Sequence, residues 1–106
     1  MKINERFEAI DLIDYYGCLL TDHQLNVLKD YYENDLSMIE IAENYGISKS
    51  AVSDLLKRSL NQLEMYENKL HLSTNALSRA IILNELLAFK DSKVQELAKA
   101  LQALEE

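Results

Sequence analysis

The chain has 106 residues, of which 48% are apolar, and a formal net charge of −7 at pH 7. This length predicts a single domain over residues 1–106. Pro is absent and only two Gly occur, which predicts that the domain is all-α. The acidity excludes a strongly basic surface, and no apolar run approaches the ~20 residues that cross a bilayer. No secretory signal is visible, so we expect a cytoplasmic protein without membrane insertion. Its single cysteine, Cys18, is then expected to be a small buried apolar residue.

The first expected helix covers residues 4–20 and carries apolar residues every three or four positions, which predicts that one side lies in the core. These residues are Phe7, Ile10, Ile13 and Tyr16 or Gly17. Two tyrosine pairs, Tyr15/Tyr16 and Tyr31/Tyr32, are each expected to place one ring in the core.

Two S/T-x-x-E/Q patterns predict the starts of the next helices. Thr21 with Gln24 forms a capping box before a helix that runs to about residue 34. Ser37 with Glu40 repeats the pattern before a short helix over residues 38–45.

The segment EIAENYGISKSAVSDLL, residues 40–56, has the spacing of a helix-turn-helix motif. Ala42 is small where two helices cross, and Gly46 can adopt the left-handed conformation that ends the first helix. Val52 packs the second helix on the first, and that helix begins after Ser48, with Ala51 where an acidic capping partner would stand. We therefore expect a helix-turn-helix core over residues 20–70.

The fourth helix is expected to be long, with apolar residues in a 4-3-4 rhythm that only Ser59 interrupts. After His71, a loop or break around residues 72–74 would precede a C-terminal extension, residues 75–106. It should hold a helix over 75–90 and a last helix capped by Ser92 with Gln95. The extension needs an apolar partner surface, either within the chain or on a second copy. A homodimer with the fourth helix as its seam and an intrachain bundle both remain open.

The outward residues at the start of the fourth helix are the candidates for contact with nucleic acid. Lys and Arg side chains bind phosphate, and Ser can bind phosphate or a base edge. Asp54 opposes such binding, and Glu40 and Glu43 are expected nearby. The candidate residues are Lys49, Ser50, Ser53, Lys57 and Arg58.

Other chemistry is not indicated. His23 and His71 have no second His or Cys at ligand spacing, so no metal site is predicted. No nucleophile, phosphate-binding loop or acid/base pair stands out. We expect a protein that is not an enzyme and has no cofactor and no small-molecule substrate.

Residues 15–70 resemble region 4 of bacterial sigma factors and, more closely, the YlxM family of small bacterial helix-turn-helix proteins. The resemblance is carried in order by YYGCLLTDHQ, YYENDLSMIEIAENYGISKSAVSDLLKR and LEMYENKL. It implies a role in the signal recognition particle pathway, with the particle's GTPase or its RNA as partner. Ser53 departs from the large aromatic residue expected at that family position.

Three functional hypotheses follow. The first is a non-enzymatic adaptor of the signal recognition particle, implied by the resemblance. The second is a DNA-binding transcriptional regulator, in which a dimer presents two fourth helices to duplex DNA about 34 Å apart. The third is a helix-turn-helix that serves only protein contact.

Overall fold

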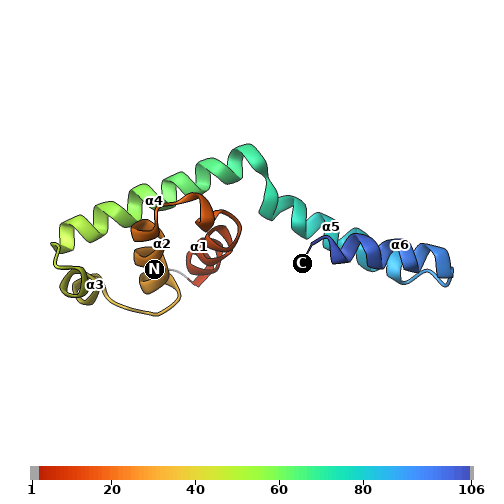
Figure 1. Cartoon of the computed structure of the whole chain (residues 1–106), viewed down its shortest axis with the longest axis horizontal. Coiled ribbons are helices and arrows are strands. Elements are labelled where there is room, and N and C mark those ends of the chain that lie inside the picture. Colours follow the sequence, from red (N-terminus) through yellow and green to blue (C-terminus); the bar gives the residue numbers. More distant parts are fainter. Residues whose placement is uncertain (1–2, 106) are drawn as a thin grey trace. The chain divides into compact units, whose positions relative to one another are not determined.

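The computed structural model describes the backbone of residues 3–105 (Figure 1) and the side chains of residues 5–105. Residues 3–105 contain six α-helices, one short 3-10 helix and no strand, which confirms the predicted all-α class. The chain divides into two compact units, Met1–His71 (unit 1) and Leu72–Glu106 (unit 2), and the single domain over 1–106 stays a prediction. The elements of unit 1 are α1 (Ile3–Tyr16), η1 (Gly17–Leu19), α2 (Asp22–Tyr32), α3 (Met38–Tyr45) and α4 (Lys49–Leu70), and those of unit 2 are α5 (Leu72–Leu87) and α6 (Ser92–Ala103).

Both predicted capping boxes are present. The Thr21 hydroxyl accepts from the Gln24 backbone N–H at 3.2 Å, while the Gln24 side chain accepts from the Thr21 N–H at 3.0 Å. Ser37 and Glu40 form the same reciprocal pair, with both distances 3.1 Å. Each box satisfies two otherwise unpaired donors, so the starts of α2 and α3 are determined locally.

The core of unit 1 lies where α4 crosses the three preceding helices, since α4 contacts α1, α2 and α3 (Figure 1). One tyrosine of each pair is buried, as predicted: Tyr16 is fully buried and Tyr32 nearly so. Tyr16 also donates a hydrogen bond from its hydroxyl to Glu67 Oε1 at 2.5 Å, which joins α1 to the later turns of α4. The buried apolar residues are Ala9, Ile13, Tyr16, Leu20, Val27, Leu28, Tyr32, Ile41, Ala42, Val52, Leu56 and Leu63.

Two expectations for the N-terminal region are wrong. Phe7 is 65% exposed, because the buried stripe of α1 is Ala9, Ile13 and Tyr16. Phe7 lies two positions before Ala9, about 200° around the helix from it. Cys18 is exposed in η1, the tight turn that replaces the expected last turn of the first helix.

The start of unit 2 also differs from the prediction. The break after α4 is confined to His71, whose φ of 55° is left-handed, and α5 begins at Leu72 instead of after a loop. The cap of α6 is Asp91 and not Ser92, since Asp91 Oδ1 accepts from the backbone N–H groups of Lys93 and Val94 at 2.8 and 3.0 Å. A carboxylate is the stronger acceptor at the positive end of a helix.

No helix within residues 3–105 combines the length and the apolar character that a bilayer crossing requires.

Ser59 is the polar residue that interrupts the apolar spacing of α4 in the sequence. In the structure it belongs to the buried stripe of this helix, with Val52, Leu56 and Leu63. The side chain is fully buried and follows Leu56 and precedes Leu63 in the buried stripe, and its Oγ has no hydrogen-bond partner among residues 3–105. An unpaired buried hydroxyl costs about 1–3 kcal/mol of folding free energy.

Replacing Ser59 by Ala should therefore stabilise unit 1. Removal of the hydroxyl, together with the better helix propensity of Ala, should raise the free energy of unfolding by about 1 kcal/mol. For a domain of this size, the melting temperature should rise by roughly 4–8 °C in a thermal scan followed by circular dichroism. The exposed Ser50 provides the control, since Ser50→Ala makes the same chemical change without relieving a buried group. A fall in melting temperature for Ser59→Ala would contradict the prediction.

Candidate nucleic-acid interface

The turn between α3 and α4 is built around Gly46. Its φ of 65° and ψ of 35° are left-handed, and its N–H bonds to the Ala42 carbonyl. The Ile47 N–H bonds to the same carbonyl at 3.0 Å, the 6→1 bond typical of a Schellman motif, and so the Ala42 carbonyl is satisfied at the end of α3. No atom lies within 4 Å of a Cβ added at Gly46, so backbone conformation alone favours glycine here.

Ser48 begins α4 as predicted. Its hydroxyl accepts from the Ala51 N–H at 3.0 Å, and no acidic residue occupies the first turn. Val52 is fully buried and Ala42 is 8% exposed, which holds the two helices in close contact. The N-terminal turns of α4 are thereby oriented with their polar side outward.

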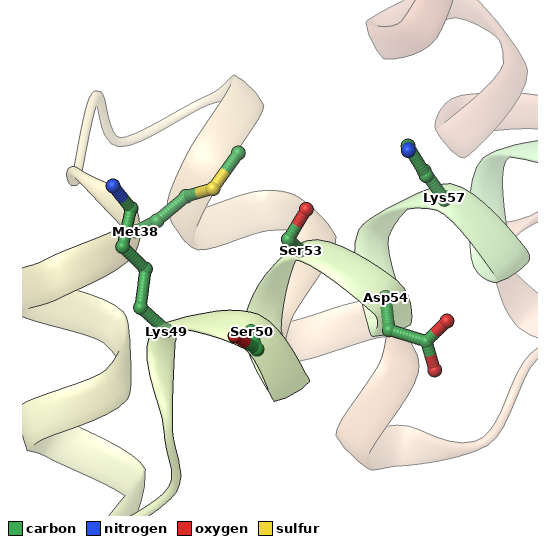
Figure 2. A pocket seen from close by; sticks show the side chains of 6 residues that line it. All are labelled: Met38, Lys49, Ser50, Ser53, Asp54 and Lys57. Atoms are coloured by element: carbon green, nitrogen blue, oxygen red, sulfur yellow. The ribbon is translucent and has the colours of Figure 1, made fainter.

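The outward side of these turns forms an open concavity of about 580 Å³ (Figure 2). We call this surface the recognition face; its residues are Lys49, Ser50, Ser53, Asp54 and Lys57, with Met38 of α3 at its border. The structure thus brings together four of the five predicted site residues, whereas Arg58 does not line the concavity. Glu40 and Glu43, which were expected nearby, do not line it either.

The charges of the recognition face are unevenly paired. Asp54 Oδ2 forms an ion pair with Arg58 Nη2, one helical turn away, at 2.9 Å. The charge of the one acidic residue of the face is thus neutralised by another residue of α4. Within residues 3–105, Lys49 and Lys57 form no such pair. Lys49 is the first residue of α4, at the positive end of the helix dipole, and Lys57 lies about two turns further along the helix. This arrangement can bind an anion such as phosphate.

Met38 is the contribution that sequence analysis missed. It is the first residue of α3 and reaches the site only because α3 and α4 pack against each other. Its half-buried thioether side chain supplies apolar surface beside Lys49 and Ser50. In the sequence, the only indication of this role is that Met38 directly follows Ser37, the N-cap of α3.

A helix closed by a left-handed Gly, a three-residue turn and a second helix with an outward polar N-terminal face define a helix-turn-helix protein. The sequence matches the family model described as "Putative helix-turn-helix protein, YlxM / p13 like" over residues 3–104, and the chain belongs to this family. This confirms the family predicted from residues 15–70.

Relatives extend over most or all of the chain. A UPF0122 protein of Clostridium perfringens (strain SM101 / Type A) is 49% identical over 86 residues, covering 81% of this chain and 77% of that protein. The UPF0122 protein YofM of Lactococcus lactis subsp. lactis is 42% identical over 106 residues, 100% of this chain and 95% of that protein. A UPF0122 protein of Streptococcus gordonii is 39% identical over 107 residues, 99% and 97% of the two chains.

Substitutions at Gly46 should follow the cost of a left-handed backbone. Gly46→Ala should lower the free energy of unfolding by about 1–2 kcal/mol, since a Cβ is unfavourable at positive φ. Gly46→Asn should lower it less, because Asn tolerates this conformation. Urea unfolding of the three proteins should give the order Gly, Asn, Ala. A larger loss for Asn than for Ala would mean that side-chain volume, and not backbone conformation, is limiting at the turn.

Removing the carboxylate of the recognition face should strengthen binding to nucleic acid. Asp54→Asn removes a repulsive charge and releases Arg58 from its ion pair, which makes one further phosphate contact available. The slope of log affinity against log salt should steepen by up to about 0.9 for duplex DNA and about 0.7 for a single strand. Fluorescence anisotropy at two salt concentrations measures this slope. Glu64→Gln, the same change in charge at an exposed residue of α4, is the matched control and should leave the slope unaltered.

Proposed function

We propose that this protein is a non-enzymatic helix-turn-helix adaptor in the signal recognition particle pathway. In this proposal the recognition face contacts the particle's RNA or the GTPase bound to it. The observation that carries the proposal is a face with an internally compensated carboxylate and two lysines that form no ion pair within residues 3–105, on a member of the YlxM / p13-like family.

The distribution of charge supports a small contact with nucleic acid. Unit 1 carries seven Lys or Arg and thirteen Asp or Glu residues, a net charge of −6, while residues 47–60 carry three cations and one anion, a net of +2. A long duplex would meet the acidic remainder of the unit and be repelled. A compact ribonucleoprotein offers a few phosphates together with protein surface, which suits one small cationic face on an acidic body.

The chemistry of the face favours backbone contact over base reading. The major groove of an RNA helix is too deep and narrow for side chains to read, so proteins contact its phosphates and 2′-hydroxyl groups. Lys49 and Lys57 are suited to phosphate, and Ser50 and Ser53 can exchange hydrogen bonds with a 2′-hydroxyl. Small residues such as Ser53 also leave room for a close approach of the sugar-phosphate backbone. The proposed RNA contact therefore depends on shape and charge more than on sequence.

Binding to signal recognition particle RNA should be measured against binding to mixed-sequence duplex DNA. Labelled samples of each are titrated with the full chain at low and at physiological salt, and fluorescence anisotropy is followed. Preference for the RNA that persists at physiological salt is expected. Preference for the duplex would contradict the proposal and favour a regulator of transcription.

Charge reversal at the two lysines should weaken this binding without unfolding the protein. Lys49→Glu with Lys57→Glu should weaken RNA binding and reduce the salt slope by about 2, one for each lost phosphate contact. An acidic residue near the start of a helix is stabilising by about 0.3–1 kcal/mol, so Lys49→Glu should not lower the melting temperature.

Lys90→Glu with Lys99→Glu gives a matched control, with the same change in charge at exposed residues of unit 2. Unchanged binding is expected for this control. An equal loss in both double variants would show that net charge, and not the recognition face, determines binding.

Duplex DNA is the alternative ligand, and the helix-turn-helix geometry itself favours it. In that case a dimer would present two α4 helices about 34 Å apart to successive major grooves. Selection from random duplexes at low salt tests this function, because an enriched sequence with two half-sites one helical turn apart is its expected product. Failure to enrich any sequence would contradict it.

A purely protein-binding motif is the third possibility. In that case, binding of the partner does not depend on the positive charges of α4. The triple variant Lys49→Gln, Lys57→Gln and Arg58→Gln removes the charges near the turn and tests this. Retained binding of this triple variant to the signal recognition particle GTPase, together with no RNA binding by the unaltered chain, would support protein contact alone.

A further inference from the structure

The apolar side chains left exposed by the fold are concentrated in unit 2. Its helices α5 and α6 are joined by a short link and pack on each other as a hairpin (Figure 1). Leu83 and Ala98 are the described side chains of this unit that are buried, so its own core is very small. Two helices with fewer than about 40 residues seldom bury enough surface to be stable alone.

The sequence of α5 is apolar on more than one side. Ile81, Ile82 and Leu83 are consecutive and therefore point in directions about 100° apart around the helix. Leu83 is buried, while Ile81 and Ile82 are more than half exposed. A helix that is apolar on several sides is typical of the interior of a larger bundle.

An ion pair identifies which exposed side chains lie on the same side of the hairpin. Arg79 Nε of α5 lies 2.7 Å from Glu105 Oε1, just beyond α6. Ile82 follows Arg79 by three positions, and Leu101 precedes Glu105 by four, so both lie on the side of the ion pair. Leu97 and Leu104 are four before and three after Leu101 and share its face. We call Ile82, Leu97, Leu101 and Leu104 the association face; all are at least 50% exposed.

The spacing and charge of the association face indicate what can cover it. Leu97, Leu101 and Leu104 have the 4-3 spacing of a helix seam that packs against another helix. The bordering Arg79–Glu105 pair is internally neutral, and unit 2 carries four cations and five carboxylates, a net charge of −1. A nucleic acid or an anionic membrane would require a cationic surface. A nearly neutral apolar face is complementary to another such face.

We infer that the association face binds the same face of a second copy of this chain, so that two α5–α6 hairpins form a four-helix bundle. A two-fold axis places each leucine stripe against its counterpart without charge repulsion. Unit 1, at −6, has no such balance, and its main apolar stripe along α4 is already buried by α1, α2 and α3. This inference concerns unit 2 and does not rest on the proposed function.

The surface available predicts a reversible dimer. Four half-exposed Leu and Ile side chains offer roughly 200–400 Å² of apolar surface per copy. A standard stable interface buries about 800 Å² per partner, polar atoms included. We therefore expect a dissociation constant on the order of micromolar for the full chain.

Sedimentation equilibrium of the full chain, from about 1 to 200 µM, tests the inference. The average mass should rise with concentration from 12.2 kDa toward twice that value. Leu97→Gln with Leu101→Gln should raise the dissociation constant at least about tenfold. Both residues are exposed, so the helical content should be unchanged by circular dichroism.

Leu77→Gln with Ile81→Gln is the matched control. Each of these residues is two positions from Arg79, about 200° around α5 and so on the other side of the hairpin. They are 68% and 55% exposed, comparable with Leu97 and Leu101 at 54% and 50%. The control should dimerise like the unaltered chain. An equal effect of both double variants, or a monomer at every concentration, would overturn the inference.

Crosslinking gives a second measurement that does not depend on loss of association. In a Cys18→Ser background, Leu101→Cys should form a disulfide-linked dimer on mild oxidation. Leu101 is the middle residue of the stripe Leu97, Leu101 and Leu104, so in the inferred bundle it lies nearest the two-fold axis, where a position meets its own counterpart. Leu77→Cys in the same background should not do so at an equal rate. Equal crosslinking at both positions would contradict the assigned face.

Discussion

The packing of α4 against three other helices is the constraint on which unit 1 depends. Val52, Leu56, Ser59 and Leu63 form one continuous buried stripe, and α1, α2 and α3 all contact the helix that carries it. Because one side of α4 is committed to the core, its opposite side must face solvent. The position of Lys49 and Lys57 is thus a consequence of core packing, although neither residue contributes to the core.

The elements that sequence alone could predict are those with local causes. The bounds expected for the third helix, about 38–45, agree with those of α3, Met38–Tyr45, because a capping box starts the helix and Gly46 ends it, both local features of the chain. Phe7 and Cys18 were misplaced because their burial depends on which side of α1 and η1 meets the other helices. The polarity of Ser59 predicts exposure, but its position on the core side of α4 determines that it is buried.

The candidate site shows the same division. Lys49, Ser50, Ser53 and Lys57 follow from helical spacing after a known start. The pairing of Arg58 with Asp54 is also a local four-residue contact, yet it changes the role of Arg58 from a free cation to a partner of a carboxylate. Met38 belongs to another helix, so only tertiary packing could reveal it. In unit 2 the apolar pattern indicated that a partner surface is needed, but the faces of α5 could be distinguished only through the Arg79–Glu105 pair.

The order of the helices along the chain has a consequence for synthesis on the ribosome. α1, α2 and α3 emerge first. Their core residues Tyr16, Leu28 and Ile41 remain exposed until Leu56 and Leu63 of α4, which bury them, have been translated. Tyr16 also lacks its acceptor until Glu67 has emerged. Completion of the core and orientation of the first turns of α4 therefore occur in the same step. A nascent chain that stops before the last turns of α4 would expose apolar surface to chaperones instead of a finished helix-turn-helix.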